Sequence, residues 1–297
     1  MVTQDPTYDL VIASGRVIDP ESKLDAIRHV GITEGVVRAI STDSLVGRTT
    51  IDAMGMVVSP GFIDLNSHGQ NHENFCALAT DGVTTALALE GGTADVDRWY
   101  SEREGDALIH HGVSVGHIPV RMAVMHDPGG YLPSGDGGRK AATEREIEAM
   151  KEQIAHGLTR GALAVGFGIQ YTPAATPWEI LELFRTAAGH HALCYVHLRY
   201  AGTREPSSGM QALEEVIAAA ALAGAPLQVT HLQSSGGKGF PRLIQRIGEA
   251  RSRGLDITGD VYPFTAAMTL IESALFDEGW QEAFGIDYPD LQWTATG

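Results

Sequence analysis

Short apolar runs that alternate with amphipathic stretches dominate the chain from about residue 57 onward. Their length and residue types are those of buried strands, and the stretches between most of them show helical spacing of apolar positions. The seven runs are VVSPGFIDL, GVTTALALE, VSVGHIPV, GALAVGFGI, ALCYVHLR, APLQVTHLQ and LDITGDVYPF. Near-continuous apolar strands that alternate with helices are typical of a parallel sheet covered on both faces. The pattern therefore predicts an α/β fold.

Helices are expected between these strands at residues 94–110, 143–156, 177–189, 208–222 and 241–253. The third has the clearest start, because Thr176 is a good N-cap and proline stands at the first helical position. A closed (β/α)₈ TIM-type barrel needs eight strands, and the sequence shows seven. We therefore predict such a barrel with its last strand missing. The alternative is an open doubly wound sheet, but GGTADV lacks the spacing of a phosphate-binding loop and we set it aside.

The N-terminal part follows a different pattern, in which short β-branched runs are separated by Gly, Asp-Pro and Glu-Gly turns. Such runs predict a small antiparallel unit of hairpins. Strands this short bury little by themselves, so the unit is expected to pack on something larger. We therefore divide the chain into an N-terminal β segment, residues 1–56, and an incomplete barrel, residues 57–297.

Composition and charge exclude several classes of function. The formal net charge of −16 argues against nucleic acid or an anionic membrane as partner, because both need basic patches. Neither a signal peptide nor a membrane-spanning run is recognisable, so we expect a cytoplasmic protein with a small-molecule substrate. Cys76 and Cys194 lie in apolar stretches and are expected to be buried, reduced thiols. An uncovered strand edge favours association between chains, so a homo-oligomer stays an alternative to a monomer.

Polar residues stand where the apolar strands end. They are Asp64, Asn66, His68, Glu90, His197, His231 and Asp260. In a parallel barrel these strand ends share the face on which barrel active sites lie. Two neutral imidazoles and one carboxylate are the donor set of a catalytic zinc. We therefore predict metal ligation by Glu90, His197 and His231.

Each of these residues has an alternative interpretation. A histidine at a strand end is often a hydrogen-bonded core residue without a ligand. Three roles stay open for Asp260: a metal ligand, a hydrogen-bond partner of a ligand, or a strand-end cap. The other histidines are interpreted as solvated or structural, namely His29, His72, His110, His111, His117, His126, His156, His190 and His191.

The same segments carry a family resemblance. GMVVSPGFIDLNSH resembles the first-strand signature of the amidohydrolase superfamily, in which PGFID is followed by an H-x-H pair. GVTT with Glu90, GIQYTP, YVHLR, VTHLQSSGGKG and GDVYPFTA follow in order and are similar to the N-acyl-D-amino-acid deacylases, including enzymes that act on N-acyl-D-glutamate. The resemblance runs from about Tyr8 to the last residue. It implies a metal-dependent (β/α)₈ barrel of the amidohydrolase kind, with a small β-sandwich to which residues 1–56 contribute.

The resemblance also implies roles for single metal ligands. His197 and His231 match the imidazole ligands of strands five and six, and Glu90 stands where this branch has a cysteine or carboxylate ligand. His68 is the second histidine of the H-x-H pair and joins the expected ligands. Asn66 replaces the first one, and an amide oxygen is a much poorer zinc ligand. One tight divalent metal site, holding Zn²⁺, is therefore expected.

Substrate contacts are expected from three further residues. Tyr171 matches a residue that helps to hold the substrate. Arg199 faces the pocket if its strand stays regular, and its guanidinium could bind the substrate carboxylate. Lys238 is a second candidate for binding an acidic substrate. For both cations the alternative is a surface loop charge.

The catalytic aspartate that the family carries on its eighth strand has no counterpart in this sequence. The chain is therefore expected to be the N-terminal part of a longer protein, or a decayed copy. The predicted activity is metal-dependent hydrolysis of the amide bond of N-acyl-D-amino acids, with N-acyl-D-glutamate as a candidate and metal-activated water as nucleophile. The alternatives are another amidohydrolase, such as a cyclic amide hydrolase or a deacetylase, and a non-catalytic remnant that only binds a ligand.

Overall fold

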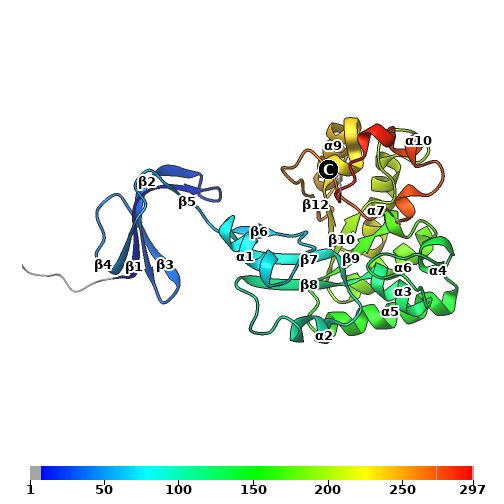
Figure 1. Cartoon of the computed structure of the whole chain (residues 1–297), viewed down its shortest axis with the longest axis horizontal. Helices are drawn as coiled ribbons and strands as arrows, with labels where there is room; N and C mark the ends of the chain where they lie inside the picture. Colours follow the sequence, from blue (N-terminus) through cyan, green and yellow to red (C-terminus); the bar gives the residue numbers. More distant parts are fainter. Residues whose placement is uncertain (1–7, 272, 296–297) are drawn as a thin grey trace, which may run out of the picture. The chain divides into compact units, whose positions relative to one another are not determined.

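The computed structural model describes residues 8–271 and 273–295. The chain forms two compact units, whose boundary lies between Phe62 and Ile63 (Figure 1). That boundary comes shortly after the one expected at residue 56. Each unit has its own sheet.

The first unit is a mixed sheet. β1 (Tyr8–Asp19) pairs antiparallel with β2 (Leu24–Thr33), which pairs antiparallel with β3 (Val36–Ser41). β4 (Gly47–Asp52) and β5 (Val57–Val58) instead run parallel to β1. The prediction of a purely antiparallel unit is therefore wrong. A tight turn joins only antiparallel neighbours, whereas the chain after β3 crosses to the other edge of β1.

The second unit contains a sheet of seven strands, β6 to β12, in sequence order. They are Phe62–Asp64, Val83–Thr93, His110–Gly116, Ala164–Gly168, Leu193–His197, Leu227–Val229 and Ile257–Gly259. From β7 to β12 the neighbouring strands are parallel. The α/β class is confirmed. Sequential strand order is that of a barrel, whereas a doubly wound sheet reverses its order part-way.

Helices join these strands. α1 to α10 are His72–Thr80, Val96–Ser101, His117–Val124, Asp136–Arg139, Glu144–Thr159, Pro177–Gly189, Gly209–Ala223, Leu232–Gly236, Phe240–Ser252 and Trp280–Phe284. Short 3₁₀ turns lie at Ile169–Tyr171, Gly237–Gly239, Ala274–Phe276 and Tyr288–Asp290. Among them α5 packs on α6 and α6 packs on α7 (Figure 1).

The longer helices occupy the predicted positions within a few residues. Thr176 caps α6 as predicted, because its hydroxyl accepts a hydrogen bond from the backbone nitrogen of Glu179. Two expectations are wrong. The segment HIPV is not strand but the start of α3, where Pro119 lies in the first turn and costs no helical hydrogen bond. The helix expected at 94–110 ends at Ser101, before Gly105 adopts a φ of +79°.

The core of the second unit lies between the sheet and its helices. In α5, Ile147, Met150 and Ile154 are buried at helical spacing, and they belong to one cluster with Val115 of β8 and Phe167 of β9. Truncating such a side chain to alanine costs about 2–5 kcal/mol. This core fixes the strands whose ends carry the polar residues.

The sheet is strongly curled. Glu90 of β7 and His197 of β10 are three strands apart, yet their side chains are 2.7 Å apart, Oε1 to Nδ1. A flat sheet would separate them by about 14 Å, since neighbouring strands lie about 4.8 Å apart. Curling therefore brings the strand ends together at one face.

Both cysteines are free thiols, but they differ in exposure. Cys194 is buried as predicted. Cys76 is only half-buried, and its Sγ lies 3.6 Å from Nε2 of His72 one helical turn away. Burial of Cys76 was expected and is wrong. Within the described residues, no helix has both the length and the apolar character needed to span a bilayer.

Candidate metal centre

Three of the predicted ligands converge at the curled face of the sheet. Glu90, His197 and His231 each offer a donor atom, and these atoms lie within 4.8 Å of one another. Besides the contact between Glu90 and His197, Nε2 of His231 lies 3.4 Å from Oε2 of Glu90. All three side chains are buried. A buried carboxylate and two imidazoles form a donor set that suits a divalent cation.

A bulge in β7 places Glu90. Between the pairs Ala88–Val113 and Thr93–Val115, β7 advances five residues while β8 advances two. Gly92 has a φ of +61° in this bulge, and a Cβ there would lie 2.4 Å from the hydroxyl oxygen of Ser114. The glycines of GGTADV therefore allow the bulge that holds the Glu90 carboxylate in the site.

His197 is the last residue of β10 and is held from both sides of its ring. Nε2 is hydrogen-bonded to Oε1 of Gln170, which fixes the ring from one side. Nδ1 lies 2.7 Å from Oε1 of Glu90. The ring nitrogen that faces Glu90 is therefore the one that could ligate a metal ion together with this carboxylate.

His231 adopts a left-handed conformation that favours glycine, with φ +33° and ψ 56°. Its backbone nitrogen donates to Oδ1 of Asp260 at 2.6 Å. The same carboxylate accepts hydrogen bonds from Tyr195 Oη, Gln228 Nε2 and Thr230 Oγ1. Asp260 is thus a partner that fixes a predicted ligand, and its lone pairs are already in use.

The protonation states at the site suit metal binding. Burial raises the pKa of Glu90, but the imidazoles of His197, His231 and His68 outweigh burial and hold this pKa well below its usual value. Burial lowers the pKa of His197 despite the neighbouring carboxylate. An ionised carboxylate and a neutral imidazole are the forms that ligate metals.

Two buried polar atoms near Glu90 are left without a partner among the described residues. They are Oδ1 of Asn66 and Nδ1 of His231. The amide nitrogen of Asn66 donates to Oε2 of Glu90 at 2.8 Å. Because a buried unpaired polar atom costs about 1–3 kcal/mol, the unpaired amide oxygen of Asn66, whose side chain contacts Glu90, favours a polar or ionic ligand there.

His68 lies beside the cluster of three. Its Nε2 is 3.6 Å from Oε2 of Glu90, and about half of its side chain is exposed. Its Nδ1 is hydrogen-bonded to the hydroxyl of Tyr131 at 2.7 Å. Burial lowers the pKa of His68, but Glu90 and Asp64 outweigh burial and raise it.

Of the three predicted substrate contacts, the structure brings Tyr171 to this site. Its ring packs edge-on against His197 at 5.1 Å between centroids, and its hydroxyl is hydrogen-bonded to Thr269. Burial and the charge of Glu90 raise the pKa of Tyr171 to about 12. The phenol is therefore neutral and can donate a hydrogen bond.

Arg199 is engaged elsewhere. Its Nε and Nη2 donate to the carboxylate of Glu215 at 2.9 and 2.7 Å, and Nη1 donates to the carbonyl of Pro173. β10 ends at His197, so strand alternation does not extend to Arg199. Arg199 and Glu215 instead line a pocket at the start of α6.

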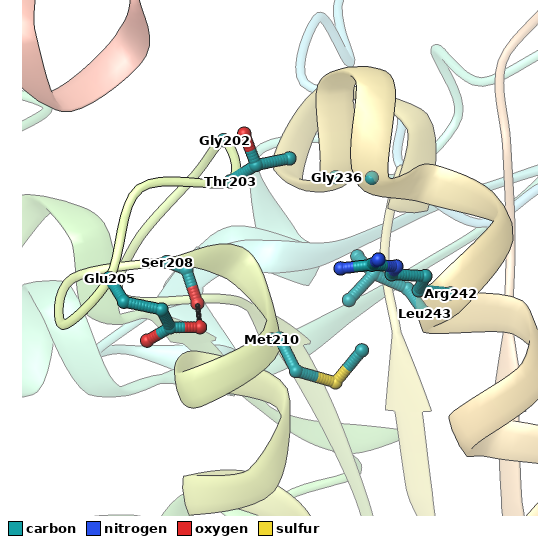
Figure 2. A pocket seen from close by; sticks show the side chains of 9 residues that line it. Gly202, Thr203, Glu205, Ser208, Met210, Gly236, Arg242 and Leu243 are labelled. Atoms are coloured by element: carbon teal, nitrogen blue, oxygen red, sulfur yellow. Dashed lines mark hydrogen bonds between the residues drawn. The ribbon is translucent and has the colours of Figure 1, made fainter.

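Lys238 lies in the exposed 3₁₀ turn Gly237–Gly239. A small pocket is present near this turn, lined by the 202–210 segment and the start of α9 (Figure 2). In it Ser208 donates to the carboxylate of Glu205, and Arg242 lies on the other side. The residues that line this pocket include none of the metal centre.

Two residues at the site were missed by sequence reasoning. Gln170 stands in the GIQYTP motif, where a polar side chain between apolar positions was a usable signal. Tyr131 lies in a loop rich in glycine and proline, whose sequence has no periodicity that points to the site.

Known proteins were compared with the chain, and no family model matches it. A D-aminoacylase of Alcaligenes xylosoxydans xylosoxydans is 27% identical over 300 residues, which cover 89% of this chain and 59% of that enzyme. An N-acyl-D-glutamate deacylase of the same organism is 29% identical over 89% of this chain and 58% of its own length. A dihydroorotase of Anaeromyxobacter dehalogenans is 28% identical over 88% of this chain and 61% of the relative.

Solved structures agree with this result. A D-aminoacylase mutant in complex with copper chloride has a TM-score of 0.73 and 26% identity, covering 88% of this chain and 59% of that one. The resemblance to D-aminoacylases is confirmed. A second D-aminoacylase structure, of an enzyme with a binuclear metal centre, gives a TM-score of 0.71 at 26% identity. The chain spans about 59% of the length of the D-aminoacylases it matches.

Proposed function

We propose that this chain carries the metal centre of an amide hydrolase that acts on N-acyl-D-amino acids, with N-acyl-D-glutamate as a candidate substrate. The observation that carries the proposal is the buried convergence of Glu90, His197 and His231. It is supported by similarity to D-aminoacylase and to N-acyl-D-glutamate deacylase along most of the chain.

Glu90, His197 and His231 would hold one divalent ion, with Zn²⁺ as our candidate. When bound, such an ion polarises the scissile carbonyl and lowers the pKa of a bound water to about 7. Curling of the sheet holds the three donors in place, and Asp260 fixes the backbone of His231.

Tyr171 would orient the acyl group, since its neutral hydroxyl lies beside the proposed centre. Arg199 would bind a substrate carboxylate only after releasing Glu215, which makes this role costly. Lys238 is exposed and has no such competitor among the described residues. Arg199 and Lys238 therefore both stay candidates for the residue that binds an acidic substrate.

Asp260 is not available to accept a proton from the attacking water. Asp260 follows the seventh strand, but its carboxylate already accepts four hydrogen bonds. The aspartate expected on an eighth strand has no counterpart within the described residues.

The decisive experiment measures metal content and hydrolysis together. We expect about one zinc per chain after purification without chelator, and strong loss of zinc in Glu90→Ala and His231→Ala. The exposed His190→Ala is the matched control and should keep its zinc. Absence of zinc from the unsubstituted chain would contradict the proposal and favour a remnant that only binds a ligand.

Substrate class is tested with N-acetyl-D-glutamate, its L-enantiomer and dihydroorotate. The assay uses this chain and any longer natural form of the protein. We expect amine release from the D-enantiomer alone, and very slow or no release by this chain itself, which lacks the expected aspartate. Hydrolysis of dihydroorotate without hydrolysis of either acyl amino acid would support the cyclic amide alternative, which the dihydroorotase relative suggests.

A further inference from the structure

The segment from residue 127 to residue 137, here called the Tyr131 loop, is held rigidly by one carboxylate. Asp127 Oδ1 accepts from the backbone nitrogens of Gly129 and Ser134, and Oδ2 accepts from those of Gly135 and Gly137. Burial raises the pKa of Asp127, but these four bonds outweigh it and lower the pKa. The carboxylate is thus ionised and closes the loop.

The loop is also anchored in the core. Leu132 is buried and forms a small cluster with Ile118 and Met122 of α3. Its neighbour Tyr131 lies instead with its hydroxyl 2.7 Å from Nδ1 of His68. A residue remote in sequence from the strand ends is thereby held at the metal centre.

Gly91 leaves the space that the Tyr131 side chain occupies. A Cβ at this position would lie 2.7 Å from the hydroxyl oxygen of Tyr131 and 3.4 Å from its Cζ. Gly91 directly follows Glu90, so the hydroxyl lies next to the proposed ligand set. Any larger residue at position 91 would displace the tyrosine side chain.

His68 needs a hydrogen-bond partner that fixes the orientation of its ring. Its side chain is about half exposed, and the companion position of the H-x-H pair holds Asn66. A histidine that ligates a metal through one nitrogen donates the proton of the other to an oxygen acceptor. The phenol oxygen of Tyr131 lies 2.7 Å from Nδ1 and is such an acceptor.

We propose that Tyr131 is a positioning residue for His68. Its hydroxyl accepts a hydrogen bond from Nδ1–H and turns Nε2 toward Glu90 and the bound ion. This role rests on the proposed metal-dependent function, because it matters only if an ion binds there. His68 then supports the ion even though its pair partner is an asparagine.

The test is a double-mutant cycle read out as zinc affinity, measured by competition with a chromophoric chelator. We expect Tyr131→Phe to weaken zinc binding about 10- to 100-fold, as for other partners of metal-ligating histidines. In a His68→Ala background the same change should have no further effect. An equal loss in both backgrounds, or no loss in either, would overturn the role while leaving the proposed function intact.

Gly91→Ala provides a second perturbation that leaves both side chains of the pair intact. We expect it to weaken zinc binding as Tyr131→Phe does. Gly130→Ala, in the same loop, is the control, because a Cβ there meets no atom within 4 Å. If the unsubstituted chain binds no zinc, the proposed function and this role fail together, which differs from failure of the role alone.

A spectroscopic readout separates positioning from general stability. In the zinc-loaded chain, ¹⁵N NMR of His68 should show a proton on Nδ1, with a signal that shifts in Tyr131→Phe. A proton on Nε2 instead would contradict the proposed orientation. Unfolding in urea should be nearly unchanged in Tyr131→Phe, because the phenyl ring is kept.

Discussion

The backbone nitrogen of His231 donates a 2.6 Å hydrogen bond to the carboxylate of Asp260, and His231 has a positive φ of +33°. A residue with a β-carbon pays for this conformation, so the surrounding structure must hold it. Asp260 does so while it also accepts hydrogen bonds from Tyr195, Gln228 and Thr230. The two strand-end residues therefore act as a unit in which only the histidine faces Glu90.

Asp260→Asn should weaken zinc binding about 10- to 100-fold, as expected for a partner that orients a metal ligand. It should also lower the free energy of unfolding by about 1–3 kcal/mol, because a carboxylate acceptor of buried donors is lost. Chelator competition and urea unfolding measure the two effects. The exposed Asp256→Asn is the control, and equal behaviour of the two variants would contradict the positioning role.

Glu179→Gln should destabilise the protein strongly. Glu179 of α6 is fully buried and pairs with Arg121 and His117 of α3, which are also fully buried. Removing the carboxylate charge leaves the guanidinium without its counter-ion, at a cost of about 3–5 kcal/mol in urea unfolding. Glu148→Gln removes only an exposed partner of Lys151 and should cost less than about 1 kcal/mol.

The same cluster should make stability fall on acidification. Burial lowers the pKa of His117. Burial raises the pKa of Glu179, but His117 and Arg121 outweigh burial and lower it. Both groups therefore take up protons more readily in the unfolded chain, so stability rises with pH.

The loss should begin as pH falls below about 6.5, the unfolded value of histidine, and continue below about 4.3, that of glutamate. The free energy of unfolding at pH 8, 6 and 5 measures the first step. His117→Gln should lose less stability than the unsubstituted protein between pH 8 and 5. A steeper loss in the variant would show that His117 is not held neutral.

Gly92→Ala should disrupt the bulge in β7. The φ of +61° disfavours a side chain, and its Cβ would approach the hydroxyl oxygen of Ser114 to 2.4 Å. We expect destabilisation of more than about 1 kcal/mol together with weaker zinc binding, because Glu90 moves. Gly248→Ala is the control, since a Cβ there meets nothing within 4 Å in a helix and should stabilise by about 0.5–1 kcal/mol.

The local pattern of apolar and polar positions was sufficient to predict the parallel sheet and most helices of the second unit. It also placed Glu90, His197 and His231 at equivalent strand ends, because parallel strands all present their carboxyl ends to one face. Polar residues at such positions are visible without any knowledge of contacts. The same reasoning failed for HIPV, the second half of the predicted strand VSVGHIPV, which begins a helix.

Only the tertiary structure decided which charges pair and which residues outside the strands reach the site. Arg199 was expected to face the substrate, yet it binds Glu215 of α7. Tyr131 reaches His68, which is 63 residues away in the sequence, because Asp127 closes its loop. The spacing of apolar residues indicates whether a position is buried, whereas the pairing of polar side chains depends on how the sheet curls and how the loops close. Both of these are set by contacts between segments distant in sequence.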